Sequence, residues 1–166
     1  MKTMTRGKPE VLWHYTKGMC MPSILREGQI RVASGQCEPN ERPAVWFSAN
    51  QVWEPTVYMI GFVNGRQQII TRDEMCDLVG GLFRIGVRPD VAPHNWDDFR
   101  RLSGVSAGMA SHLKKVGYEV GARISEWFVT FDPVPSEKWV AVESWNGRAW
   151  EAAPHPEAKV NASQTA

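Results

Sequence analysis

The sequence predicts an α+β fold with a split, mostly antiparallel β-sheet core and peripheral helices. Short runs of aromatic and β-branched residues outnumber the segments with helical spacing. The helical segments fall between these runs at irregular intervals, whereas regular alternation would indicate a parallel sheet. No glycine-rich phosphate-binding motif of the Rossmann or P-loop type is present, so neither of those folds is indicated.

The first strand is predicted over residues 11–16, because apolar and aromatic residues dominate there and a turn signal follows. Strand alternation places His14 and Thr16 on one face and Tyr15 on the other. A polar ring on such a strand fits two interpretations. It is either part of the wall of a ligand cleft or a core histidine bonded to a backbone carbonyl.

Further elements follow from periodicity, capping and turn composition. Helices are expected over 21–28, 71–79, 96–102 and 107–116, the last closed by Gly117. Strands are expected over 29–32, 44–48, 82–87, 126–131, 139–145 and 148–151, and 58–63 fits either a strand or a buried helix turn. A capping box at Thr71 and Glu74 supports the second helix, and Asn146-Gly147 predicts a hairpin between the last two strands. The loop over 34–43 is long enough to border a functional site.

The length of 166 residues fits one domain, which we expect over residues 11–152. A flexible N-terminus (1–10) and a disordered tail (153–166) are expected on either side. The formal net charge of +1 argues against nucleic-acid binding through bulk charge. The apolar runs are too short to cross a bilayer, and the three cysteines show no metal-ligand spacing. We therefore expect a cytoplasmic protein with no metal and no membrane partner.

Three separate pieces of the chain carry the residue types of a ligand site. His14 lies on the first strand, Trp46-Phe47-Ser48 end a middle strand, and Glu126 opens a late strand. Over roughly residues 11–131 they resemble the ADP-ribosyltransferase fold family, especially its diphtheria-toxin-like branch. The resemblance implies a split antiparallel sheet. It also implies an enzyme that transfers ADP-ribose from NAD to a protein or nucleic-acid acceptor and releases nicotinamide.

The resemblance implies two sets of NAD contacts. His14 and Thr16 of the first strand, with Tyr15 between them, would contact the ribose. The nicotinamide would be held by Trp46, Phe47 and Ser48 and by one later ring, Trp53 or Tyr58. On chemical grounds, Arg84 and Arg123 are candidates for binding the pyrophosphate. Guanidinium groups form bidentate bonds to phosphate, although a surface ion pair is an equal alternative for each arginine. Glu126 would be the catalytic glutamate. Glu54 is the rival carboxylate, with a loop or capping role as its alternative.

A carboxylate and flat aromatic faces suit this chemistry. Nicotinamide leaves as the sugar gains positive charge, and a nearby carboxylate stabilises that charge. Aromatic faces hold the pyridinium ring by stacking and cation–π attraction, worth about 0.5–2 kcal/mol. We therefore expect His14, Ser48 and Glu126 to face one cleft.

Two departures from the family pattern narrow this hypothesis. Trp46 stands where the family usually shows tyrosine. Ile124 and Ser125 do not supply the acidic or glutamine partner of arginine-modifying members, so modification of protein arginine is disfavoured. Among the hypotheses, a stand-alone toxin or phage-type effector is the first. An RNA 2′-phosphotransferase, which also uses NAD but needs basic residues around a phosphate, and a non-catalytic binding or inhibitor module stay open.

Overall fold

The computed structural model describes residues 9–153. Residues 1–8 and 154–166 lie outside the described residues, and with them most of the expected flexible N-terminus and disordered tail. The described part of the chain forms four α-helices and eleven β-strands, which confirms the predicted α+β class. None of the helices within residues 9–153 is long and apolar enough to span a bilayer.

The helices are α1 (Met21–Glu27), α2 (Arg72–Leu78), α3 (Trp96–Leu102) and α4 (Ala107–Glu119). The first strands are β1 (Leu12–Lys17), β2 (Gln29–Ile30), β3 (Val45–Ser48), β4 (Met59–Val63), β5 (Arg66–Ile70) and β6 (Leu82–Val87). The later strands are β7 (His94–Asn95), β8 (Trp127–Thr130), β9 (Val134–Pro135), β10 (Trp139–Trp145) and β11 (Trp150–Ala152).

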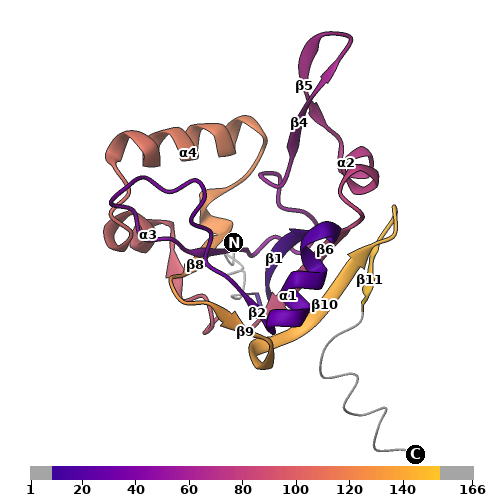
Figure 1. Cartoon of the computed structure of the whole chain (residues 1–166). Helices are drawn as coiled ribbons and strands as arrows, with labels where there is room; N and C mark the ends of the chain where they lie inside the picture. The colour runs from indigo at the N-terminus through magenta and orange to yellow at the C-terminus, as the bar shows by residue number, and fades with distance from the viewer. Residues whose placement is uncertain (1–8, 154–166) are drawn as a thin grey trace, which may run out of the picture.

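Seven strands form the central sheet in the order β11-β10-β6-β1-β3-β8-β7, and all neighbouring pairs are antiparallel. β1 pairs with β6 along its whole length but with β3 only through Trp13 and Ser48. The sheet is therefore split between β1 and β3. Two further antiparallel pairs, β2–β9 and the hairpin β4–β5, lie outside it, and the hairpin projects from the body of the molecule (Figure 1).

Helices pack at the periphery of both halves of the split sheet. On the first half, Met21 of α1 packs with Leu12 of β1 in one hydrophobic cluster. On the second half, α3 and α4 cover β8, and Phe99 shares a cluster with Trp127. Met75 of α2 belongs to a smaller cluster beside β6. The first cluster also takes in Val45 and Phe47 of β3, so it spans the split, whereas the second lies on the β8 side.

Most predicted elements are present, and several of their end signals act as expected. Thr71 Oγ1 accepts from the Glu74 amide at 3.3 Å, and Glu74 Oε2 accepts from the Thr71 amide at 3.0 Å, so the capping box is confirmed. The ambiguous segment over 58–63 is a strand, β4. A turn at Asn64-Gly65 leads from it into β5, a strand that the sequence analysis missed along with the short β7.

The predicted end of the fourth helix is wrong, because α4 continues through Gly117 to Glu119. A Cβ atom at Gly117 would lie 2.5 Å from Cη2 of Trp127. Glycine here permits close approach between helix and strand and does not stop the helix. Several strand boundaries also differ by one or two residues. Glu126 belongs to a 3-10 turn that precedes β8, and the C-terminal return strand is β11 at Trp150–Ala152, two residues later than its predicted start.

Candidate functional site

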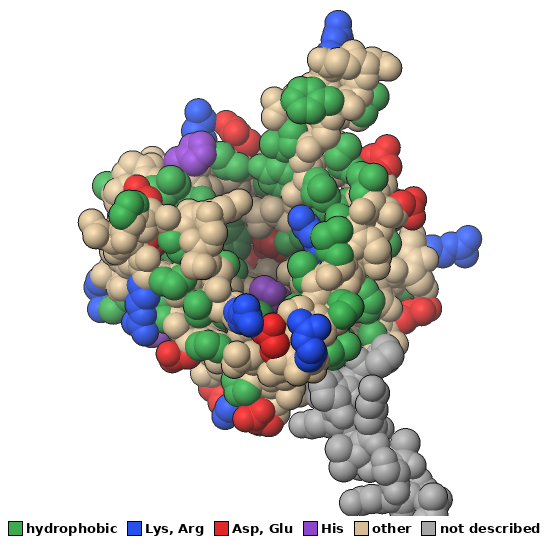
Figure 2. Space-filling model, viewed as in Figure 1, with side chains coloured by type: hydrophobic (Ala, Val, Ile, Leu, Met, Phe, Trp, Pro, Cys, Tyr) green, Lys and Arg blue, Asp and Glu red, His purple; other side chains and the backbone are tan. Residues whose placement is uncertain are grey.

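A cavity of about 660 Å³ opens where β1 and β3 part. Its size lies in the range of small-molecule sites, about 300–1,000 Å³. Figure 2 shows the hollow between α4 and the hairpin β4–β5, with hydrophobic side chains around it. The lining is mostly aromatic and aliphatic, and consists of Trp13, His14, Tyr15, Gln36, Trp46, Phe47, Ser48, Glu54, Thr56, Val57, Tyr58, Ile60, Trp96, His112, Leu113, Val116, Gly117 and Trp127.

His14 bridges the split between the two strands. Its Nδ1 lies 2.9 Å from the carbonyl oxygen of Trp46. Because a carbonyl can only accept, Nδ1 carries the proton, and the neutral ring keeps its lone pair on Nε2. Burial lowers the pKa of His14, and the bond to Trp46 opposes that shift only in part. The ring is therefore a neutral group at the cavity wall that can accept a hydrogen bond, for example from a ribose hydroxyl.

Glu54 supplies a buried carboxylate to the cavity and is only 5% exposed. Its Oε2 accepts from Ser48 Oγ at 2.6 Å. Its Oε1 accepts from Thr56 Oγ1 at 2.7 Å, from the Thr56 amide at 3.3 Å and from Trp127 Nε1 at 3.2 Å. All four donors are neutral groups, so the hydrogen bonds fix the carboxylate in place without neutralising it.

Ring packing fixes the aromatic wall of the cavity. The Trp46 ring centroid lies 4.5 Å from that of Phe99 and 6.2 Å from that of Trp127, both edge-on. The Phe47 ring lies 5.7 Å from the His14 ring. Rings held by several neighbours stay in one rotamer, so the wall is formed in advance of any ligand.

Six of the eleven site residues predicted from the sequence line the cavity, and five do not. The first group is His14, Tyr15, Trp46, Phe47, Ser48 and Tyr58. The second group is Thr16, Trp53, Arg84, Arg123 and Glu126. His14 and Ser48 therefore face one cleft, as expected, but Glu126 does not join them there.

Glu126 instead fastens the segment that leaves β3. Its Oε2 accepts from Asn50 Nδ2 at 3.3 Å, and its backbone oxygen accepts from the Ala49 amide at 2.8 Å. Arg123 lies exposed in the loop before Glu126, and Thr16 faces Phe83 in the ladder between β1 and β6. These positions leave Glu54 as the carboxylate that a ligand in the cavity would meet.

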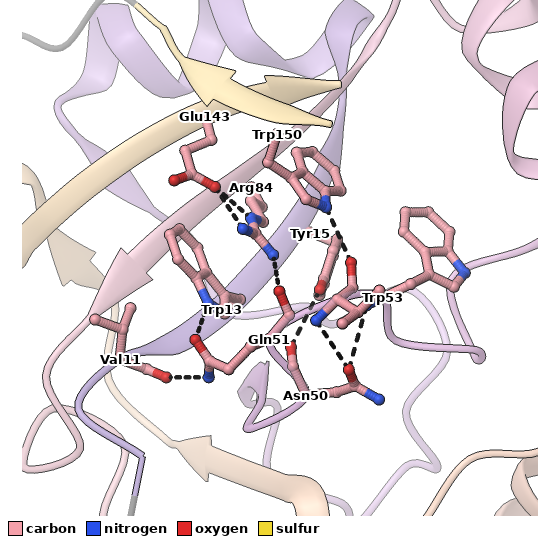
Figure 3. A network of polar contacts seen from close by, with 10 residues as sticks. Val11, Trp13, Tyr15, Asn50, Gln51, Trp53, Arg84, Glu143 and Trp150 are labelled. Atoms are coloured by element: carbon pink, nitrogen blue, oxygen red, sulfur yellow. Dashed lines mark hydrogen bonds and ion pairs between the residues drawn. The ribbon is translucent and has the colours of Figure 1, made fainter. Parts of the chain in front are cut away.

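Arg84 is buried and is bonded to protein groups (Figure 3). Its Nε and Nη2 each lie 2.6 Å from Oε2 of Glu143, and its Nη1 donates to the carbonyl of Gln51 at 2.8 Å. The guanidinium carbon lies 3.9 Å from the ring centroid of Trp13 and 4.5 Å from that of Trp150. Of the two alternatives for this arginine, the structure has the ion pair, here in a buried form.

Tyr15 joins this network to the cavity. Its hydroxyl donates to the carbonyl of Asn50 at 3.4 Å, and its ring lies edge-on to Trp53 at 5.3 Å. Burial raises the pKa of the Tyr15 phenol, although the nearby Arg84 guanidinium opposes that shift. The phenol therefore stays protonated at neutral pH and acts as a hydrogen-bond donor.

Sequence reasoning missed the contribution of α4, which brings His112, Leu113 and Val116 to the cavity. With Lys114 and Lys115 close by in the sequence, His112 has the pattern of a solvated surface residue, and it is exposed at this position. Thr56 was also missed, although it belongs to an unusual Trp-Glu-Pro-Thr corner at residues 53–56. A threonine two residues after an acidic residue was the available signal, because its hydroxyl and amide can both reach the carboxylate.

No group of three or more His, Cys, Asp or Glu side chains that could hold a metal ion occurs within residues 9–153. A comparison of the chain with models of protein families, with curated proteins and with solved structures found no match. The candidate site is an aromatic cavity at the split in the sheet, with a neutral histidine and a buried carboxylate on its wall.

Proposed function

We propose that this protein is an NAD-dependent ADP-ribosyltransferase, with Glu54 as its catalytic carboxylate. The observation that carries the proposal is the Glu54 carboxylate, held by neutral donors in an aromatic cavity beside Ser48 and His14. Such a carboxylate attracts a cation, and the aromatic rings favour a flat one. The nicotinamide ring of NAD is a flat cation of this kind.

The charge of the cavity lining favours a cationic ligand over an anionic one. Of the described residues that line the cavity, none is lysine or arginine. A phosphate placed there would meet the Glu54 carboxylate with no cationic partner, which is strongly unfavourable in a low-dielectric site. This favours binding of the nicotinamide end of NAD over an RNA 2′-phosphate, and so disfavours the 2′-phosphotransferase alternative.

Each group in the cavity has a role in the proposed reaction. The bond between C1′ of the ribose and the nicotinamide nitrogen breaks, and its electron pair leaves with nicotinamide. Glu54 stabilises the positive charge that develops on the ribose, and the neutral His14 ring accepts from a ribose hydroxyl. The acceptor then bonds to C1′ and gives up its proton, and water can replace a protein or nucleic-acid acceptor in this step.

A non-catalytic binding or inhibitor module is the second candidate. The position of Glu126 favours it, because the glutamate that matched the family pattern is not in the lining. On this alternative the cavity binds a cationic aromatic ligand and leaves it unchanged. The two candidates differ in turnover but share the ligand.

Release of nicotinamide from NAD tests the proposal. The purified full-length chain is incubated with NAD, and free nicotinamide is separated by chromatography and quantified over time. We expect time-dependent release in the wild type and none above background in a Glu54→Gln variant. Calorimetric binding of NAD without release would support the module, and neither binding nor release would reject both candidates.

A further inference from the structure

The position of Glu54 depends on the short segment that connects it to Ser48. This segment, Ala49 to Trp53, has no regular secondary structure. Two of its amides, those of Val52 and Trp53, donate to Asn50 Oδ1 at 3.0 and 3.3 Å. These local bonds give the segment its shape, but they do not fix it to the body of the protein. Contacts from other elements must do that.

Arg84 of β6 makes one such contact. By donating to the Gln51 carbonyl it ties the segment to the central sheet, and its pairing with Glu143 of β10 holds the guanidinium in place. The Gln51 side chain adds bonds to β1 and to the residue before it. Its Oε1 accepts from Trp13 Nε1 at 2.9 Å, and its Nε2 donates to the Val11 carbonyl at 2.9 Å. Figure 3 shows these side chains converging on the segment.

Tyr15 and Glu126 also bond to Asn50, and Glu126 bonds to Ala49 as well. Trp150 of β11 adds a contact from the C-terminal hairpin. Its Nε1 donates to the Val52 carbonyl at 2.9 Å. Its ring stacks on that of Trp53 with 14° between the planes and 6.2 Å between centroids. The same ring covers the Arg84 guanidinium, so the hairpin both bonds to the segment and covers the arginine that holds it.

We propose that Trp150 is a positioning residue, which holds the segment from Ala49 to Trp53 so that Glu54 keeps its place in the cavity. The inference rests on the proposed function for its effect on catalysis. Trp150 is not among the residues that line the cavity, so it would act on the reaction through Glu54. This positioning role also gives a reason for the hydrogen bond between Val52 and Trp150, which lie 98 positions apart in the chain.

The C-terminal hairpin supplies a matched control for the test. Trp145 pairs directly with Trp150 across the hairpin, and its Nε1 also donates over 2.9 Å, but to Asp73 of α2. Trp150→Phe and Trp145→Phe therefore remove the same indole N–H from neighbouring sites. Only the first change removes a bond to the segment that carries Glu54.

Two measurements on the full-length wild type and both variants test the proposal. In hydrogen–deuterium exchange, Trp150→Phe should speed exchange at the Val52 and Trp53 amides by about 3- to 10-fold, the effect of losing one neutral hydrogen bond. In the nicotinamide-release assay it should lower kcat by about 3- to 10-fold and leave KM unchanged, because a misplaced carboxylate affects the transition state and not the ground state. Trp145→Phe should change neither quantity.

Exchange at Val52 and Trp53 that is equal in the two variants would overturn the proposal. Faster exchange in Trp150→Phe with an unchanged kcat would overturn it as well, because Glu54 would then be independent of the segment. A wild type that releases no nicotinamide rejects the proposed function. In that case the exchange measurement still decides whether Trp150 holds the segment.

Discussion

Replacing Glu54 with glutamine should abolish nicotinamide release while the protein stays folded. Glutamine has nearly the same shape and keeps one oxygen that accepts from Thr56 and Trp127. Its amide group would face Ser48 Oγ, and that hydroxyl can accept as well as donate. The change therefore removes the charge and keeps most of the hydrogen-bond geometry.

The effect on stability follows from two opposing terms. Hydrogen bonds to a charged group are worth about 1.5–3 kcal/mol and those to a neutral group about 0.5–1.5 kcal/mol, so the retained bonds weaken. Against this, the variant no longer buries a carboxylate without a cationic partner, a cost of several kcal/mol. We expect a free energy of unfolding within about 1 kcal/mol of the wild type, measured by urea denaturation.

The effect on the reaction is larger because nothing offsets it. A full charge about 4 Å from the developing positive charge, at an effective dielectric constant of about 20, contributes about 4 kcal/mol. Each 1.36 kcal/mol is about tenfold in rate, so Glu54→Gln should reduce nicotinamide release by about 10³-fold. Glu126→Gln is the matched control, because its amide oxygen can still accept from Asn50 and it does not line the cavity. Normal release in Glu54→Gln, or loss of release only in Glu126→Gln, would refute the assignment of Glu54.

Two further predictions test the packing around the cavity. The folded state keeps His14 neutral, while the unfolded chain takes up a proton below the ordinary pKa of 6.5. Stability should therefore fall as the pH is lowered through about 6.5, by at most about 1.4 kcal/mol per pH unit, and His14→Gln should flatten this dependence in thermal unfolding. Gly117→Ala should destabilise the protein by about 1–3 kcal/mol, because the new methyl group meets the Trp127 ring. Gly108→Ala on the same helix meets open space and should be neutral or stabilising by up to about 1 kcal/mol, so equal effects of the two alanines would contradict the close approach.

Local signals in the sequence were sufficient for most of the fold. The capping box at Thr71 and the glycine after α1 act within a few residues, and strand alternation around His14 depends only on the chain itself. Gly117 shows where such signals fail. The same residue type ends one helix and lets another pack against a tryptophan, and only the tertiary contact distinguishes the two roles.

The site was harder to predict because its carboxylate is placed by distant parts of the chain. Glu54 and Glu126 each stand next to a tryptophan, Trp53 and Trp127, and nothing local to either shows which one faces a cavity. The difference arises because Trp127, not Glu126, lies opposite Ser48 between β3 and β8. That register puts the Trp127 indole beside Glu54 and leaves Glu126 at the turn, where it bonds to Asn50.

The split between β1 and β3 gives His14 a structural role at the cavity wall. If the register that pairs Trp13 with Ser48 continued, Tyr15 would lie opposite Trp46 and their backbones would close the ladder. Instead the strands part after one pair, and the Trp46 carbonyl needs another donor because an unpaired buried carbonyl is costly. The His14 ring supplies that donor across the wider gap, at 2.9 Å. A side chain of this reach keeps the strands apart and satisfies the freed carbonyl, so the same residue that borders the cavity also helps to hold it open.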